Sequence, residues 1–221
     1  MSEEFCTDWT VVIPVKPAAI GKSRLAATGS ARADLARAIA LDTIAAAAAV
    51  CRVIVVTDDA EVAAAARGLG ADAVAETPSA ASDADGTAET PARGLNAAIA
   101  TGVAVARAGG ATNCAALLGD LPALRPADLA AALREAATAD RAVVADAEGT
   151  GSTLVTARAG VPWAASFGDG SFARHVEAGC VALHLPDAST LRRDVDTPAQ
   201  LAAAARLGLG PHTIAVRSGG R

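Results

Sequence analysis

The chain contains no tyrosine, and aromatic residues make up only 2% of its 221 positions. Lysine and arginine form no extended run, and the net charge is −5. Nucleic-acid binding normally needs a basic surface, often with aromatic rings on which bases stack. No nucleic-acid partner is therefore expected.

Long apolar runs are also missing, although 52% of the residues are hydrophobic, most of them alanine. A helix that spans a bilayer needs about 20 consecutive apolar residues. The alanine-rich run Ile39–Val50 is interrupted by Asp42 and Thr43, so no membrane partner is expected. The first nine residues lack the basic and apolar segments of a secretory signal, which favours a cytoplasmic location.

The four cysteines lie far apart and form no CxxC pair. Cys51 and Cys114 stand at the starts of apolar strands, where the sequence predicts small buried thiols in a reduced protein. The three histidines, His175, His184 and His212, are scattered. They form neither a metal cluster nor a Ser/His/Asp arrangement, and each is expected to be a packing or surface residue.

What the chain does contain is a regular alternation of apolar strands and helical segments. The expected strands are 10–15, 52–57, 73–76, 114–118, 141–145, 152–157 and 181–185. The expected helices are 31–49, 59–69, 95–108, 126–137, 171–178 and 197–207. This pattern predicts one α/β domain (1–221), whose mostly parallel sheet carries helices on both faces. The core is expected at about 10–207, the acidic segment 77–91 as a surface loop, and 208–221 as a frayed tail.

Two acidic motifs lie at or just past the ends of apolar runs. Asp120 follows Gly119 in the first, and Asp194 and Asp196 lie near the carboxyl end of the chain. Ligands of open α/β sheets bind outside the carboxyl ends of the strands. In an extended segment Asp194 and Asp196 point to the same side, where a cation would relieve their repulsion.

The three carboxylates together therefore predict a Mg²⁺ site suited to phosphate chemistry. Alternatives stay open at this point. Asp120 by itself is also typical of a helix cap or turn, and Arg192 or Arg193 would also neutralise the Asp194 and Asp196 pair.

The segment after the first strand, 16–24, carries the opposite charge in Lys16, Lys22 and Arg24. Gly21–Ser23 matches the second half of the Walker phosphate loop, but Lys16 stands where that motif has its first glycine. A backbone cradle is therefore not expected. Side-chain charge is predicted to neutralise a nucleoside triphosphate instead, the alternative being a solvated basic loop.

Two turns of small residues, 149–153 and 167–171, supply a further candidate site. A glycine-rich turn that enters a helix gathers free N–H groups and favours a phosphate or carboxylate. The alternatives are a plain hairpin for the first turn and an ordinary serine cap for the second. Together the two turns predict a pocket for a small anion.

Several segments, in this order, resemble the guanylyltransferases of coenzyme F-420 biosynthesis, the CofC or FbiD family. They are Val11–Lys16, Lys22–Leu25, Gly94–Ala98, Gly119–Pro122, Gly149–Gly151, Phe167–Ser171 and Asp194–Pro198. The resemblance implies a Rossmann-like, GT-A type nucleotidyltransferase that joins GMP from GTP to phosphoenolpyruvate or 2-phospho-L-lactate and releases pyrophosphate. Asp169 stands where members of that family commonly have proline.

The resemblance also implies roles for individual residues. Asp120, Asp194 and Asp196 would hold Mg²⁺, and Lys22 and Asp120 would be catalytic. The phosphorylated three-carbon acid would contact Ser152, Gly168 and Ser171, with Thr153 as the alternative to Ser152. GTP would contact Lys16, Lys22, Arg24, Thr57, Asp58, Leu95 and Asn96.

Other functions stay open beside this one. The first is a molybdenum-cofactor-type nucleotidyltransferase on the same fold, and the second is a glycosyltransferase with a similar metal site. The third is a non-catalytic nucleotide-binding regulator, which has no need of all three carboxylates. A homodimer also stays open.

Overall fold

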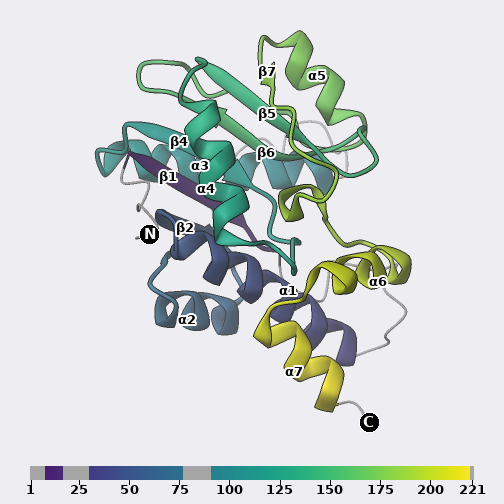
Figure 1. Cartoon of the computed structure of the whole chain (residues 1–221). Helices are drawn as coiled ribbons and strands as arrows, with labels where there is room; N and C mark the ends of the chain where they lie inside the picture. The colour runs from purple at the N-terminus through teal and green to yellow at the C-terminus, as the bar shows by residue number, and fades with distance from the viewer. Residues whose placement is uncertain (1–7, 17–29, 77–90, 220–221) are drawn as a thin grey trace, which may run out of the picture.

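The computed structural model of the chain describes residues 8–16, 30–76 and 91–219. Its sheet has the strand order β3-β2-β1-β4-β6-β5-β7 (Figure 1). The strands are β1 (Trp9–Pro14), β2 (Arg52–Val56), β3 (Asp72–Val74), β4 (Asn113–Leu117), β5 (Arg141–Ala145), β6 (Ser152–Ala157) and β7 (Val181–Ala182). All neighbouring strands are parallel except β6, which runs antiparallel to both β4 and β5. The predicted mostly parallel α/β sheet is confirmed.

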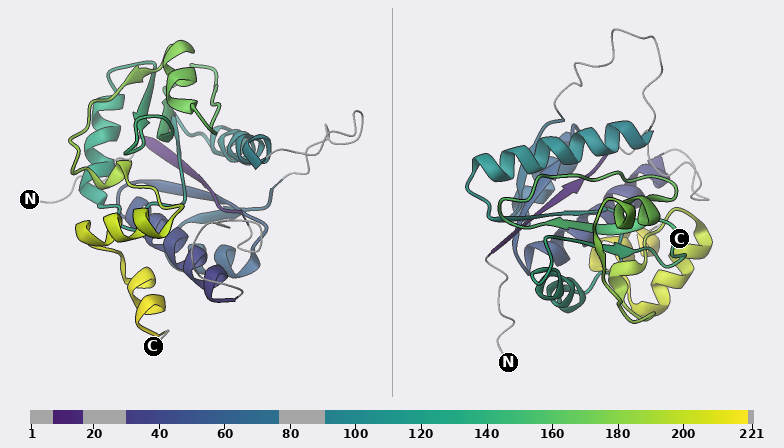
Figure 2. Two further views of the ribbon diagram at one scale, coloured as in Figure 1. Left: turned by 90° about the vertical axis from the view of Figure 1, so that its right-hand side faces the viewer. Right: turned by 90° about the horizontal axis from the view of Figure 1, so that it is seen from above.

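Helices cover both faces of this sheet. They are α1 (Ser30–Ala48), α2 (Ala60–Gly68), α3 (Pro91–Ala108), α4 (Pro126–Ala136), α5 (Ser171–Glu177), α6 (Pro198–Leu207) and α7 (Pro211–Gly219), with a 3-10 turn, η1 (Thr190–Arg192). Helix α3 lies on one face and α1, α2 and α4 lie on the other (Figure 2).

The side chains of β1 pack alternately against the helices on the two faces of the sheet. Val11 and Ile13 pack into the apolar cluster of α1, α2 and α4, whereas Val12 packs into the cluster of α3. Successive side chains of a strand point to opposite faces, so a strand covered on both sides must be apolar throughout. The run Trp9–Pro14 comes close to that condition, since all six of its residues are buried and Thr10 has its one polar side chain.

Two helices begin with a side chain that caps them. Asp59 caps α2, where its carboxylate accepts from the backbone N–H groups of Glu61 and Val62 at 3.0 and 3.2 Å. Thr197 caps α6 in a capping box with Gln200, and Pro198 takes the first helical position. Each cap satisfies N–H groups that a helix leaves unpaired at its amino end.

The carboxyl-terminal segment differs from the predicted frayed tail, because Pro211–Gly219 forms α7 against α1. The carboxylate of Asp42 on α1 is only 4% exposed and accepts from the N–H groups of His212 and Thr213 at 2.9 and 2.8 Å. Asp42 thus satisfies the first turn of a helix 170 residues away. The residues near the carboxyl end do not reveal this contact by themselves, because Asp42 lies far away in the sequence.

Gly102 of α3 lets the helix approach the sheet closely. A Cβ at this position would overlap the γ-methyl groups of Val12 and Val56. We expect Gly102→Ala to lower the free energy of unfolding by about 1–3 kcal/mol, because a packed core does not absorb the extra carbon without strain. Thermal or urea unfolding measures this loss.

Gly68→Ala is the matched control, because Gly68 is also a helical glycine, at the end of α2, but has open space around its Cβ position. It is expected to leave stability unchanged or to raise it by up to about 1 kcal/mol. Equal stability of the two variants would show that α3 does not depend on this close contact.

Candidate active site

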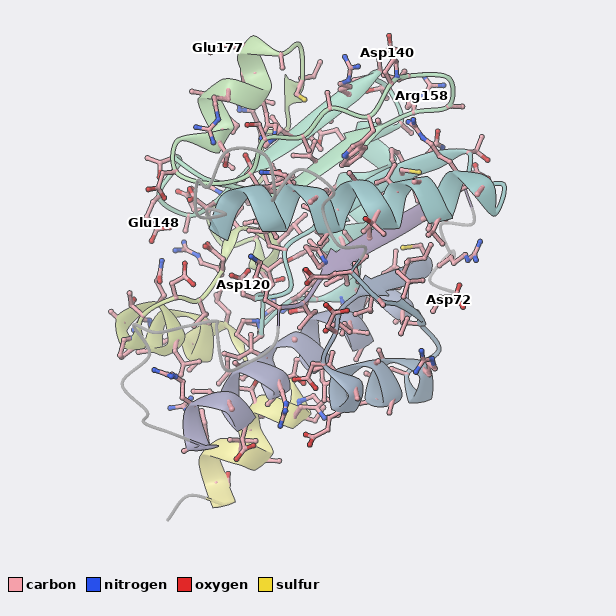
Figure 3. All side chains as sticks on the ribbon, turned by 180° about the vertical axis from the view of Figure 1, so that it is seen from behind. Asp72, Asp120, Asp140, Glu148, Arg158 and Glu177 are labelled. Atoms are coloured by element: carbon pink, nitrogen blue, oxygen red, sulfur yellow. The ribbon has the colours of Figure 1, made fainter. Side chains whose placement is uncertain are left out.

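A cavity of about 390 Å³ opens at the carboxyl ends of β1 and β4. Most of its lining comes from five separate parts of the chain. These are the end of β1 with Lys16, the segment Leu118–Asp120, the turn at Asp146 and Thr150–Ser152, the loop Phe167–Ser171, and Asp194 with Asp196. Leu95 and two alanines of α1 complete it. Figure 3 shows Asp120 and Glu148 at this end of the sheet and Asp72, Asp140 and Arg158 at the other.

The three predicted metal carboxylates lie together in this cavity. Asp120, Asp194 and Asp196 each offer an oxygen, and these oxygens lie within 4.8 Å of one another. Asp120 and Asp194 are half-buried and Asp196 is exposed. Three carboxylates so close, with only oxygen donors, can hold a hard divalent cation.

Backbone contacts place these carboxylates. The N–H of Val195 donates to the carbonyl of Asp120 at 3.0 Å, and the side chain of Val195 is fully buried. Because neighbouring side chains of an extended segment alternate, Asp194 and Asp196 face away from that core. Beyond the end of β4, the N–H of Leu121 donates to the buried hydroxyl of Thr43 at 3.0 Å.

Asp194 is the most perturbed acid of the described residues. Burial and, after it, the charges of Asp120, Asp146 and Asp196 raise its pKa to about 8. Its Oδ1 atom is buried and has no hydrogen-bond partner among the residues that the structure describes. A buried carboxylate oxygen surrounded by like charge is unfavourable until a cation neutralises it. The site therefore fits a divalent metal.

Asp146, at the end of β5, belongs to a second acidic group. Its carboxylate lies within reach of Glu148 and Asp194. However, its two oxygens also accept from the N–H groups of Thr150 and Gly151 at 2.9 and 2.7 Å. Asp146 therefore holds the small-residue turn between β5 and β6, and a side chain at Gly151 would overlap it. The antiparallel pairing of β5 and β6 makes this turn a hairpin, which was one of its two predicted interpretations.

The residues predicted to bind the phosphorylated three-carbon acid, which would be the acceptor of the GMP group, lie together beside the three carboxylates. Ser152 begins β6, Ser171 begins α5, and their hydroxyl oxygens lie 3.3 Å apart. Gly168, with φ of 126°, lies in the loop above them. Thr153, the alternative to Ser152, is buried, does not line the cavity, and its hydroxyl has no partner in the described part of the chain. The geometry thus favours Ser152.

Three side chains fix the loop that carries Gly168. Asn96 of α3 donates to the carbonyl of Phe167 at 3.1 Å and accepts from its N–H at 2.9 Å. Arg174 of α5 donates to the carbonyl of Ser166 at 3.0 Å. His175, also of α5, accepts from the N–H of Ser166 at 2.8 Å. The loop is held in place before any ligand binds.

The predicted GTP residues separate into groups. Lys16 and Leu95 line the cavity. Thr57 and Asp58 are not among the residues that line it. Thr57 accepts from the N–H of Asp59 at 3.1 Å, and Asp58 accepts from the N–H of Glu76 at 3.0 Å. Lys22 and Arg24 lie outside the described residues, as does nearly all of the predicted acidic loop 77–91.

The sequence of the chain matches that of a known protein family. The sequence pattern of the family described as "Guanylyl transferase CofC like" matches residues 9–210. The chain belongs to the CofC-like guanylyl transferase family. The match covers every carboxylate and hydroxyl of the cavity described above.

Relatives of this CofC-like chain carry one common name, phosphoenolpyruvate guanylyltransferase. The protein of Thermomonospora curvata is 47% identical over 213 residues, which cover 94% of this chain and 88% of the relative. That of Sanguibacter keddieii is 48% identical over 240 residues, covering 94% and 84%. That of Streptomyces coelicolor is 46% identical over 214 residues, covering 94% and 95%.

Solved structures share the fold of the CofC-like chain at low identity. A Desulfovibrio desulfuricans protein assigned as a nucleotide-diphospho-sugar transferase has a TM-score of 0.57 at 15% identity, covering 91% of this chain and 96% of that one. A cytidylyltransferase of Leptospira borgpetersenii has a TM-score of 0.52 at 11% identity, covering 96% and 93%. At such identities the comparison supports the architecture alone. Within the described residues, the CofC-like chain has no helix long and apolar enough to cross a membrane.

His175 was not predicted to lie at this site. It was expected only as a packing or surface residue, yet its Nδ1 atom lies 2.9 Å from the hydroxyl oxygen of Ser152. One signal was present, because residues four apart on a helix share a face and Ser171 is four residues before His175. Burial, with a smaller contribution from the charge of Arg174, lowers the pKa of His175 to about 4.

The lowered pKa of His175 predicts acid sensitivity. The unfolded chain binds a proton near pH 6.5 and the folded chain only near pH 4, so the unfolded state binds more protons in between. Stability contributed by His175 is therefore present above pH 6.5 and lost as the pH falls to 4, by up to about 3 kcal/mol. In urea unfolding, the stability gap between wild type and His175→Phe should narrow over this window. If the difference in stability between wild type and His175→Phe did not change with pH, His175 would not have a lowered pKa in the folded protein.

Proposed function

We propose that this chain is a phosphoenolpyruvate guanylyltransferase of coenzyme F-420 biosynthesis. It joins GMP from GTP to the phosphate of phosphoenolpyruvate in the cytoplasm and releases pyrophosphate. The observation that carries the proposal is the cavity itself, in which the acidic group Asp120, Asp194 and Asp196 adjoins the hydroxyl pair of Ser152 and Ser171.

In the proposed reaction, a phosphate oxygen of the acceptor attacks the α-phosphorus of GTP in line. A new phosphorus–oxygen bond forms, the bond between the α-phosphorus and the bridging oxygen breaks, and pyrophosphate leaves. A phosphate monoester is already anionic near neutral pH, so no strong general base is required. Positioning and charge neutralisation supply the catalysis.

The chain's own residues divide this work. Ser152, Ser171 and the loop at Gly168 orient the acceptor. Asp120, Asp194 and Asp196 would hold Mg²⁺, which would neutralise charge on the triphosphate when bound. Lys16 lies on the cavity wall, where its ammonium group would face the triphosphate. Lys22 and Arg24 are proposed to add positive charge that neutralises the triphosphate, and Lys22 to act in catalysis.

An acceptor screen tests the proposal. The purified protein is incubated with Mg²⁺ and GTP, and with phosphoenolpyruvate or 2-phospho-L-lactate, while pyrophosphate release is followed. We expect turnover with GTP and phosphoenolpyruvate, and much less with ATP or CTP. Release of pyrophosphate only with a molybdopterin acceptor would favour the cofactor nucleotidyltransferase. Binding of GTP without turnover on any acceptor would favour the regulator.

A further inference from the structure

His175 lies directly beneath the loop of the proposed acceptor site, yet the reaction as described gives it no role. Its side chain is only 1% exposed. The ring packs edge-on against Phe167, with centroids 5.2 Å apart and planes at 69°. Both ring nitrogens have partners, Ser166 on one side and Ser152 on the other.

The backbone of Ser166 determines which nitrogen of His175 carries the proton. A backbone N–H can only donate, and that of Ser166 points at Nε2 from 2.8 Å. Nε2 is therefore the unprotonated nitrogen of a neutral ring. The single ring proton is on Nδ1, which donates to the hydroxyl oxygen of Ser152 at 2.9 Å.

Counting protons in the serine pair gives a definite result. Ser152 and Ser171 have one hydroxyl proton each, and one hydrogen bond of 3.3 Å joins the two oxygens. That bond uses one of the two protons, whichever serine donates it. The other proton cannot go to His175, because Nδ1 already carries a hydrogen. Both serines line the cavity, so a ligand bound there can accept the remaining O–H.

We propose that His175 is a positioning residue that makes the Ser152 and Ser171 pair a hydrogen-bond donor toward an anionic group of the acceptor. The proposal rests on the proposed function. With the opposite tautomer, Nδ1 would accept a hydroxyl proton and no donor would remain for the ligand. The site would then favour a ligand that donates, whereas a phosphate or carboxylate only accepts.

The tautomer itself is the first test, and it needs neither ligand nor substitution. The wild-type protein is labelled with ¹⁵N-histidine, and the ring nitrogens of its three histidines are observed by NMR near neutral pH. His175→Phe assigns the resonance that disappears. We expect the Nδ1–H form for His175. An Nε2–H form, or a doubly protonated ring, would overturn the proposal.

Kinetics supply the second test. His175→Phe keeps the ring's shape but loses both hydrogen bonds. We expect it to raise the KM for phosphoenolpyruvate about 10- to 100-fold and to leave the KM for GTP within about twofold. His175→Asn, whose amide N–H can take the place of Nδ1–H, should recover part of the loss. Val176→Ala, at an exposed position of the same helix, is the control and should behave as wild type.

A double substitution separates positioning from general support of the fold. If His175 acts through the hydroxyl pair, His175→Phe should change the acceptor KM by less than about twofold once Ser152→Ala is present. If each substitution raised the acceptor KM by its full factor in the double variant, the proposal would be overturned.

The failure of this inference and that of the proposed function can be told apart. A wild-type protein that releases no pyrophosphate with GTP and either phosphorylated acid would refute the function, while the tautomer measurement would still stand. A wild-type protein that turns over, combined with an unchanged acceptor KM in His175→Phe, would refute only the role of His175.

Discussion

Asp120→Asn is expected to reduce guanylyl transfer about 10³-fold or more while the protein remains folded. Asparagine keeps the shape of the side chain but removes one of three negative charges from the proposed cation site. The backbone contacts that place this residue do not depend on its carboxylate. They are the bond from Val195 to the Asp120 carbonyl and the bond from Leu121 to Thr43.

Single-turnover rates with GTP and phosphoenolpyruvate measure this loss, and thermal unfolding checks the fold. Asp140→Asn is the matched control. It removes the same charge from an exposed residue that Figure 3 shows well away from Asp120. The control should transfer at the wild-type rate. A rate for Asp120→Asn within about tenfold of wild type would refute its proposed metal role.

The elements of the fold could be predicted because their signals are local. The apolar run Arg52–Thr57 contains the five-residue strand β2, and the run Thr10–Val15 contains all of the six-residue strand β1 except Trp9. The reversed direction of β6 is different, because nothing within Ser152–Ala157 states which neighbours it pairs with. Helix α7 was missed for the same reason, since its start depends on Asp42 of α1.

The candidate site was predictable to the extent that its residues follow strand ends. Asp120 follows the end of β4, where an open sheet binds its ligands, whereas Asp194 and Asp196 follow the 3-10 turn η1 and are joined to Asp120 by the backbone bond from Val195. Asn96 shows where this reasoning stops. The GTP contact that the family resemblance implies for Asn96 stays a prediction, and no spacing in the sequence indicated that its side chain also holds the backbone of Phe167, 71 residues further along. The partner of a polar side chain is a property of packing, and sequence spacing does not reveal it.

Asp194→Asn is expected to have two effects of opposite sign. It should reduce guanylyl transfer about as severely as Asp120→Asn, because it removes another carboxylate from the proposed cation site. It should also stabilise the cation-free protein. Asp194 is half-buried, and burial and neighbouring acids raise its pKa to about 8. Ionising it in the fold is therefore costly.

The sign of the pH dependence follows from that raised pKa. The folded chain holds the Asp194 proton up to about pH 8, whereas the unfolded chain releases it near pH 3.8. The folded state binds more protons in this window, so the stability that Asp194 contributes is lost as the pH rises. In the presence of EDTA at pH 8 to 9, we expect the free energy of unfolding of Asp194→Asn to exceed that of wild type by about 2 kcal/mol, which corresponds to roughly 4–8 °C in Tm. The gain should vanish near pH 4.

A bound cation should make wild type more stable than Asp194→Asn, because it stabilises only the folded state that binds it. Millimolar Mg²⁺ at pH 8 should raise the Tm of wild type and leave that of Asp194→Asn nearly unchanged. Asp196→Asn is the comparison within the same cluster. The Asp196 carboxylate is exposed, so water already screens its charge. Without a cation, Asp196→Asn should therefore raise the free energy of unfolding by less than Asp194→Asn does. If Mg²⁺ raised the Tm of Asp194→Asn as much as that of wild type, the cation would be bound elsewhere, and the acidic cavity would need another explanation.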